Sequence, residues 1–240
     1  MGRGRALAGV GGCAALGAAA CWAAPAPAVH VPRLAGAFGL PLTLERSSAA
    51  ALTFDDGPHP LGTPAVMEHL AAAGVRATFF VVGEAVERAP SLVQELAAAG
   101  HELAVHGYRH RLLLGRRGAA LRDELERCLD LLGGLTGRRP RLYRPPHGIF
   151  SVGGIGVVRR AGLEPLLWSR WGRDWERRAT PERVAERAAA GLRPGDVVLL
   201  HDSDRYSASG SWRVTAAALP SILESAAAAG VPLVAASQSR

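Results

Sequence analysis

The sequence has 240 residues, of which 48% are hydrophobic and 20% are charged. This length is sufficient for one large domain with a substantial core. The formal net charge of +7 comes from Arg residues scattered along the chain, with no basic run interleaved with aromatic residues, which excludes a typical nucleic-acid-binding protein. Two of the three Cys residues lie near the N-terminus and only Cys128 lies in the body of the chain, so no disulfide framework is available.

The first 24 residues have the layout of an export signal. A short basic start at residues 1–5 precedes an uncharged run, rich in Ala and Gly, at residues 6–24. This run is near the lower length limit of a membrane span and only weakly hydrophobic. We therefore predict a signal peptide or a membrane anchor at residues 1–24, and hence an exported protein that is extracellular, periplasmic or anchored at the cell surface.

The rest of the chain divides into a linker and a catalytic domain. Residues 25–48 contain several Pro and Gly residues, which is typical of a linker, and residues 49–240 form the predicted domain. Apolar and β-branched runs indicate seven strands, at residues 49–54, 77–82, 102–105, 141–144, 165–169, 196–200 and 231–235. Helical patterns with capping signals indicate six helices, at residues 63–73, 84–99, 119–132, 152–161, 181–190 and 212–229. This alternation favours an α/β fold built from parallel βαβ units.

Polar residues gather where the predicted strands end. They are Asp55, Asp56, His106, His110, Arg144, Asp174 and His201. In a barrel or an open parallel sheet, the carboxyl ends of the strands converge on one face, and functional sites are built there. The sequence therefore predicts a single site that combines these side chains.

Two of these residues, His106 and His110, have the spacing of metal ligands. One helical turn or a tight loop directs both imidazoles to one point, and one Asp completes a set of two His and one carboxylate. Three protein ligands with one open position describe a catalytic zinc site, although Co²⁺, Ni²⁺ and Mn²⁺ accept the same donors. The alternative is a pair of loop histidines with no metal.

Five motifs, taken together and in order, resemble those of the polysaccharide deacetylases, the carbohydrate esterase family 4 enzymes with a NodB homology domain. They are Thr53-Phe54-Asp55-Asp56-Gly57-Pro58, the His106/His110 pair, Arg144-Pro145-Pro146 with Gly148, Asp174-Trp175 and Leu199-Leu200-His201. The resemblance spans residues 49–235. It implies a distorted (β/α) barrel with about seven parallel strands, and a hydrolase that removes N-acetyl groups from an amino sugar.

The resemblance also implies roles for individual residues. Asp56, His106 and His110 would bind the metal, and Asp55 would be the general base that takes a proton from the attacking, metal-held water. His201 would protonate the leaving amine.

The remaining motif residues would support these groups. Asp174 would orient His201, Arg144 would hold Asp55 ionised, and the backbone N–H of His147 would stabilise the oxyanion. Trp175 and Leu199 would shape the pocket wall, with core packing as the alternative.

Three residues depart from the family pattern. Gly107 stands where the family usually has Ser or Thr, His147 replaces an aromatic residue, and Trp171 occupies the place of the first Asp of the fourth motif. Together with Trp168 and Trp175, Trp171 forms an aromatic cluster that either stacks on a sugar or packs in the core. These changes bear on the substrate more than on the reaction class.

We therefore predict metal-dependent deacetylation of polysaccharide that contains N-acetylglucosamine, such as peptidoglycan or a chitin-like polymer. One alternative is a deacetylase or amidase with the same site that acts on a small or lipid-linked amino sugar. A second alternative is a non-catalytic carbohydrate-binding protein, and a third is a structural barrel without metal.

Overall fold

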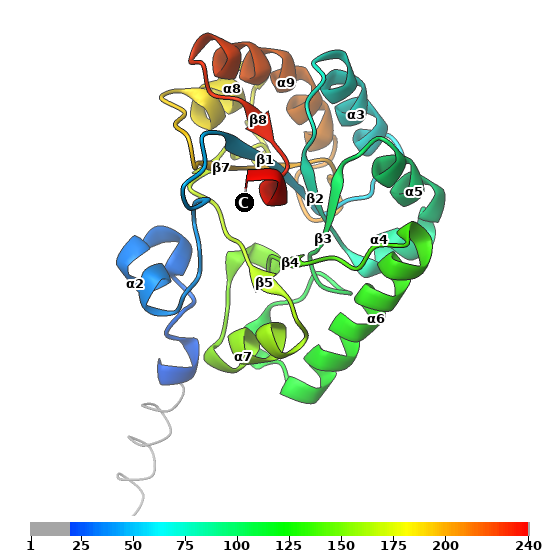
Figure 1. The fold of residues 1–240 in the computed structure, drawn as a ribbon, viewed down its shortest axis with the longest axis vertical. Helices are drawn as coiled ribbons and strands as arrows, with labels where there is room; N and C mark the ends of the chain where they lie inside the picture. The colour runs from blue at the N-terminus through cyan, green and yellow to red at the C-terminus, as the bar shows by residue number, and fades with distance from the viewer. Residues whose placement is uncertain (1–19, 240) are drawn as a thin grey trace, which may run out of the picture.

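Eight short strands, paired in parallel, form the centre of the fold. The structure is a computed structural model, and it describes residues 20–239. The strands are β1 (Ala50–Asp55), β2 (Thr78–Val81), β3 (Glu102–Val105), β4 (Leu142–Tyr143), β5 (Glu164–Pro165), β6 (Arg170–Trp171), β7 (Val197–His201) and β8 (Leu233–Val234). Seven of them follow the order β5-β4-β3-β2-β1-β7-β6, and β8 pairs with β1. The sheet curls into a distorted barrel (Figure 1), which confirms the predicted fold class.

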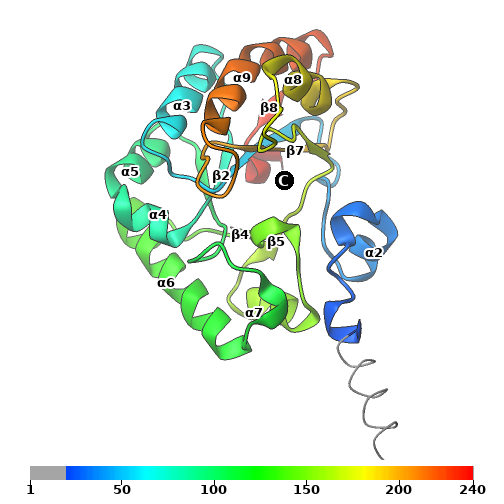
Figure 2. The same cartoon turned by 180° about the vertical axis from the view of Figure 1, so that it is seen from behind.

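Helices surround this sheet on its outer side, as the two opposite views show (Figure 2). The α-helices of the body are α3 (Gly62–Ala72), α4 (Gly83–Arg88), α5 (Pro90–Ala98), α6 (Gly118–Thr136), α7 (Val152–Arg160), α8 (Pro181–Ala189) and α9 (Ser211–Ala228). Short 3₁₀ turns are η1 (Ala28–His30), η2 (Leu113–Gly115), η3 (Pro146–Gly148) and η4 (Ala236–Ser239). Every residue of β1 is buried, because this strand has neighbours on both edges and helices outside the barrel.

The helix predicted at residues 84–99 is divided in two. Ala89 has φ −138° and ψ 58°, which is not helical, and α5 starts at Pro90. Because Pro has no N–H and restricts the residue before it, the chain leaves α4 and begins a new helix at this point. The helix predicted to end at residue 132 continues to Thr136, and Gly137 with φ 68° ends it, since Gly adopts the left-handed conformation easily.

The fifth predicted strand is also divided, because it changes partners. The amide of Leu166 donates to the carbonyl oxygen of Tyr143 on one side, whereas the amide of Ser169 donates to that of Val197 on the other. Between them, the amide of Leu167 donates to the carbonyl oxygen of Pro41. Residues 164–171 therefore pass from β4 to β7, with a segment from the N-terminal part of the chain at the crossing.

That N-terminal segment is packed, although the sequence predicts a linker at residues 25–48. The structure contains η1 and the short helix α2 (Pro32–Ala37) there, and it buries Ala28, Ala35, Leu40 and Leu44 in the hydrophobic core. We call residues 28–44 the N-terminal arm. Its small apolar residues fit against the barrel, which the Pro and Gly content of the segment does not reveal.

The signal peptide or anchor predicted at residues 1–24 lies outside the described residues, apart from residues 20–24. Trp22 donates a hydrogen bond from Nε1 to the carbonyl oxygen of Leu114 at 2.9 Å. Within residues 20–239, no helix combines the length and the apolar character needed to cross a membrane.

Candidate functional site

The first motif forms the turn after β1. Asp55 is the last residue of the strand, and Asp56 follows with φ 76°, in the left-handed region that a non-Gly residue seldom adopts. This turn directs both neighbouring carboxylates to the same side, and both are buried. Gly57 is required next, because a Cβ at this position would collide with the carboxylate of Asp202.

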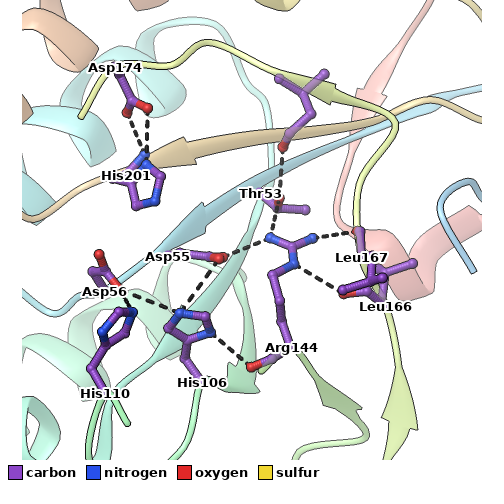
Figure 3. Close-up of polar contacts among 11 residues, drawn as sticks. Thr53, Asp55, Asp56, His106, His110, Arg144, Leu166, Leu167, Asp174 and His201 are labelled. Atoms are coloured by element: carbon purple, nitrogen blue, oxygen red, sulfur yellow. Dashed lines mark hydrogen bonds and ion pairs between the residues drawn. The ribbon is translucent and has the colours of Figure 1, made fainter. Parts of the chain in front are cut away.

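Asp56, His106 and His110 lie together at the carboxyl ends of β1 and β3 (Figure 3). The Oδ1 of Asp56 is 3.4 Å from Nε2 of His106 and 3.3 Å from Nε2 of His110. Each residue offers one ligand atom, and these atoms all lie within 4.8 Å of one another. The three predicted metal ligands therefore form one cluster of donor atoms.

The chemistry of the three donors fits a divalent cation. Nδ1 of His106 lies 2.9 Å from the carbonyl oxygen of Arg144; since a carbonyl only accepts, Nδ1 carries the proton and Nε2 presents a lone pair. Among the described residues, Oδ1 of Asp56 is a buried oxygen without a hydrogen-bond donor. The contact of His106 Nδ1 with a carbonyl oxygen is typical of metal-binding His residues, whose second ring nitrogen commonly holds a hydrogen-bond partner.

Burial and charge set the protonation of these ligands. Burial, and next the neighbouring His106, lower the pKa of His110 to about 3, so its imidazole is neutral at pH 7. Burial raises the pKa of Asp56, but the interaction with His106 and the positive charge of His201 outweigh it and bring that pKa to about 2. A neutral imidazole and an ionised carboxylate are the forms that bind metal.

Arg144 holds Asp55 in place from inside the barrel. Its NH1 donates to Oδ1 of Asp55 at 2.7 Å and to Oγ1 of Thr53 at 2.9 Å, while Nε and NH2 donate to the carbonyl oxygens of Leu166 and Leu167. Burial lowers the pKa of Arg144, and Asp55 opposes this effect. The guanidinium thus occupies one carboxylate oxygen of Asp55 and leaves Oδ2 turned toward His106, 3.7 Å from its Nε2.

His201, at the end of β7, is held in a similar way by Asp174. The backbone N–H of His201 donates to Oδ2 of Asp174 at 2.6 Å, and Nδ1 lies 3.0 Å from Oδ1. Thr215 donates to the same carboxylate at 2.7 Å. Burial lowers the pKa of His201, but Asp174, with smaller contributions from Asp56 and Asp55, raises it to about 9. His201 is therefore protonated at neutral pH, with Nε2 free of Asp174.

A cavity of about 240 Å³, which we call the site cavity, unites these groups. Its polar lining includes Asp55, Asp56, His106, His110, His147 and His201, and its apolar lining includes Trp168, Trp171, Trp175 and Leu199. The structure thus brings the predicted metal ligands, the predicted acid and base and the predicted wall residues to one cavity, with Arg144 and Asp174 directly behind it.

Comparisons with known proteins agree with this arrangement. The sequence profile described as "Polysaccharide deacetylase" matches residues 45–166. A chitooligosaccharide deacetylase of Azorhizobium caulinodans is 34% identical over 171 residues, which cover 71% of this chain and 81% of the relative. The chain belongs to the polysaccharide deacetylase family.

Similarity to peptidoglycan deacetylases appears in both sequence and structure. A peptidoglycan-N-acetylglucosamine deacetylase of Bacillus cereus is 34% identical over 159 residues, which cover 63% of this chain and 71% of the relative. A crystal structure of a peptidoglycan N-acetylglucosamine deacetylase superposes with a TM-score of 0.77 at 25% identity, covering 86% of this chain and 95% of that one. Chitooligosaccharide deacetylases and peptidoglycan deacetylases are thus both related to this chain.

Within this polysaccharide deacetylase fold, His147 has φ 60° in the turn η3. Its ring meets the ring of His110 edge to face, with centroids 4.5 Å apart. Gly148 follows with φ 70°, and a Cβ there would collide with Trp168. The exposed ring of His147 therefore lies beside a predicted metal ligand at the rim of the site cavity.

The sequence motifs indicate neither Tyr206 nor Asp202, although both lie close to the predicted site residues. The ring of Tyr206 stacks on that of His110, with centroids 4.1 Å apart and an angle of 13°, and no local motif indicates this contact. Asp202, which directly follows His201, is buried and accepts a hydrogen bond from Thr63. Burial raises the pKa of Asp202 to about 7. Its position beside Gly57 depends on the pairing of β1 with β7, which the sequence does not display.

Proposed function

We propose that this chain hydrolyses N-acetyl groups of polysaccharide that contains N-acetylglucosamine. The proposal rests on one observation. A single cavity brings together three potential metal ligands, the carboxylate of Asp55, which Arg144 holds, and the imidazole of His201, which Asp174 holds. The related chitooligosaccharide and peptidoglycan deacetylases support the substrate class.

Asp56, His106 and His110 would hold a divalent metal. We propose Zn²⁺, with Co²⁺, Ni²⁺ and Mn²⁺ as alternatives because nitrogen and oxygen donors discriminate weakly among these ions. A bound cation of this kind supplies Lewis-acid chemistry, which polarises the acetamide carbonyl and makes water more acidic.

Asp55 is the proposed general base. Arg144 occupies its Oδ1, so the free Oδ2 accepts a proton from the attacking water. As the water oxygen forms a bond to the acetyl carbon, the carbonyl oxygen becomes an oxyanion, for which we propose the backbone N–H of His147 as a donor. The buried ion pair with Arg144 keeps Asp55 oriented before the reaction.

His201 is the proposed general acid. Asp174 fixes its Nδ1, so Nε2 is the atom that donates a proton to the amine nitrogen while the carbon–nitrogen bond breaks. The products are acetate and a free amine. An amine leaves readily only when it is protonated, and the elevated pKa of His201 keeps that proton available at neutral pH.

The wall of the site cavity would orient the sugar. Trp175 packs against His201, with ring centroids 5.3 Å apart, and Leu199 and Trp171 line the same cavity. We propose that these apolar surfaces hold the pyranose ring so that its acetamide faces Asp55 and His201, as is usual for pockets with few polar groups in an apolar lining.

We further propose that the protein is exported and that it keeps its N-terminal segment after export. The retained segment would allow association with a membrane. The contacts of Trp22 with Leu114 and the complete burial of Ala28 support retention, because cleavage after residue 24 or 28 would remove residues that belong to the fold. Mass spectrometry of the mature N-terminus tests this; a start beyond residue 22, which removes the Trp22–Leu114 contact, contradicts retention.

Acetate release from peptidoglycan, N-acetylglucosamine oligomers and N-acetylglucosamine itself tests the proposed function. We expect release from the polymers or oligomers, and a rate lower by about 10²–10⁴-fold in the Asp55→Asn variant. Activity confined to the monosaccharide would favour the small-molecule alternative. Binding without release in both proteins would favour a non-catalytic carbohydrate-binding protein.

A further inference from the structure

Three aromatic rings form a row that leads from His201 to the N-terminal arm. The ring of Trp175, which packs against His201, lies 5.6 Å from that of Trp171, and the ring of Trp171 lies 5.4 Å from that of His30. We call Trp175, Trp171 and His30 the aromatic row. The two Trp residues are half-buried and His30 is exposed, so the row runs from the interior of the site to the surface.

A second cavity, of about 410 Å³, lies at the outer end of this row. The N-terminal arm supplies most of its lining, including His30, Leu42 and Thr43, and the barrel supplies Trp168 and Ser169. We call it the arm cavity. Trp168 lines both the arm cavity and the site cavity, so the two hollows adjoin across one indole ring.

The sizes of the two cavities favour a ligand longer than one unit. Ligand pockets in proteins commonly measure about 300–1,000 Å³, whereas the site cavity measures about 240 Å³. The site cavity alone is therefore small, and the two cavities together fall within the usual range. When one unit of a polymer occupies the site cavity for reaction, the neighbouring unit needs a surface on which to lie. The aromatic row provides an apolar surface for it.

We propose that the arm cavity, with Trp171 and His30, binds a second sugar unit of the acetylated polymer, adjacent to the unit that reacts. This inference rests on the proposed function. The apolar face of a pyranose would pack on the rings, while the imidazole of His30 and the exposed hydroxyl of Thr43 would hydrogen-bond its hydroxyl groups. The N-terminal arm is then a part of the substrate-binding surface as well as of the core.

The test compares N-acetylglucosamine with its dimer in two assays. The first follows binding by tryptophan fluorescence, and the second measures acetate release. The variants are His30→Ala and Trp171→Ala, and His69→Ala is the matched control because it removes a His side chain from α3, away from both cavities. Circular dichroism and thermal unfolding identify any variant that does not fold, and the exposed position of His30 makes its replacement the safer one.

We expect the wild type to bind the dimer roughly tenfold more tightly than the monosaccharide, the factor that one aromatic contact can supply. The preference should shrink several-fold in His30→Ala and in folded Trp171→Ala, and it should persist in His69→Ala. Equal affinity for monosaccharide and dimer in the wild type, or an unchanged preference in His30→Ala, overturns the proposal.

The two assays separate this inference from the proposed function. A length preference that depends on His30, without acetate release from any substrate, would support the second subsite and contradict the deacetylase activity. Acetate release with no length preference in binding or in kcat/KM would support the activity and contradict the subsite.

Discussion

Asp55 and His201 are direct partners in the parallel pairing of β1 with β7. Neighbouring strands lie about 4.8 Å apart, so the sheet itself sets the separation of the proposed base and acid. Arg144 and Asp174 then fix the two side chains from opposite sides of the site cavity. The backbone of the barrel, more than its loops, therefore determines how these two groups face a substrate.

Replacement of Asp55 by Asn should abolish most of the activity. Loss of a general base reduces the rate by about 10²–10⁴-fold, and metal binding should persist because Asp55 is not one of the three clustered ligands. Acetate release and metal content measure the two effects. Asp130→Asn, at an exposed position on α6, is the control and should keep the wild-type rate; a similar rate in Asp55→Asn would exclude Asp55 as the base.

Replacement of Arg144 by Leu should destabilise the fold strongly. Removal of one member of a buried ion pair costs about 3–5 kcal/mol, and Arg144 is fully buried against Asp55. Denaturant unfolding gives the free energy. Arg141→Leu is a matched control, because its side chain is 77% exposed and pairs with Glu164 at 3.5 Å, a contact worth about 0–1 kcal/mol. Equal losses in the two variants would contradict the structural role of Arg144.

Single replacement of His106 or His110 by Ala should remove tight binding of one Zn²⁺ per chain. Each variant loses one of three protein ligands, and the remaining Asp and His form an incomplete set. Elemental analysis after dialysis measures the bound metal, and His69→Ala should retain it. One equivalent of metal in both His106→Ala and His110→Ala would place the metal elsewhere.

The activity should decline at high pH as His201 loses its proton. Its folded pKa of about 9 lies above the ordinary 6.5, so the His201–Asp174 interaction stabilises the fold fully below about pH 6.5, and this contribution disappears as the pH rises through about 9. Since Asp174 supplies the main favourable charge, Asp174→Asn should move the basic limb of the kcat profile to lower pH. A basic limb at the same pH in this variant and the wild type would contradict His201 as the acid.

Much of the site could be predicted because its residues come directly after predicted strands. Asp55, His106, Arg144 and His201 each end or follow a strand, and the parallel arrangement brings such positions to one face. The local signals that identify them, which are short motifs and strand ends, lie within a few residues of each functional side chain.

The features that could not be predicted depend on contacts between distant segments. Asp202 is buried because Thr63 and Gly57 lie against it across the β1–β7 pairing. The division of the strand at residues 165–169 reflects the hydrogen bond from Leu167 to Pro41. The N-terminal arm resembles a linker in composition, yet its small apolar side chains pack on the barrel.

The most direct test of the account is acetate release from N-acetylglucosamine tetramer by one preparation of the full chain, measured before chelation, after exhaustive chelation and after addition of Zn²⁺. The account predicts release, its loss on chelation and its recovery with the metal, with no recovery in Asp55→Asn. Undiminished release after complete removal of metal, or no release under any of these conditions, would contradict it.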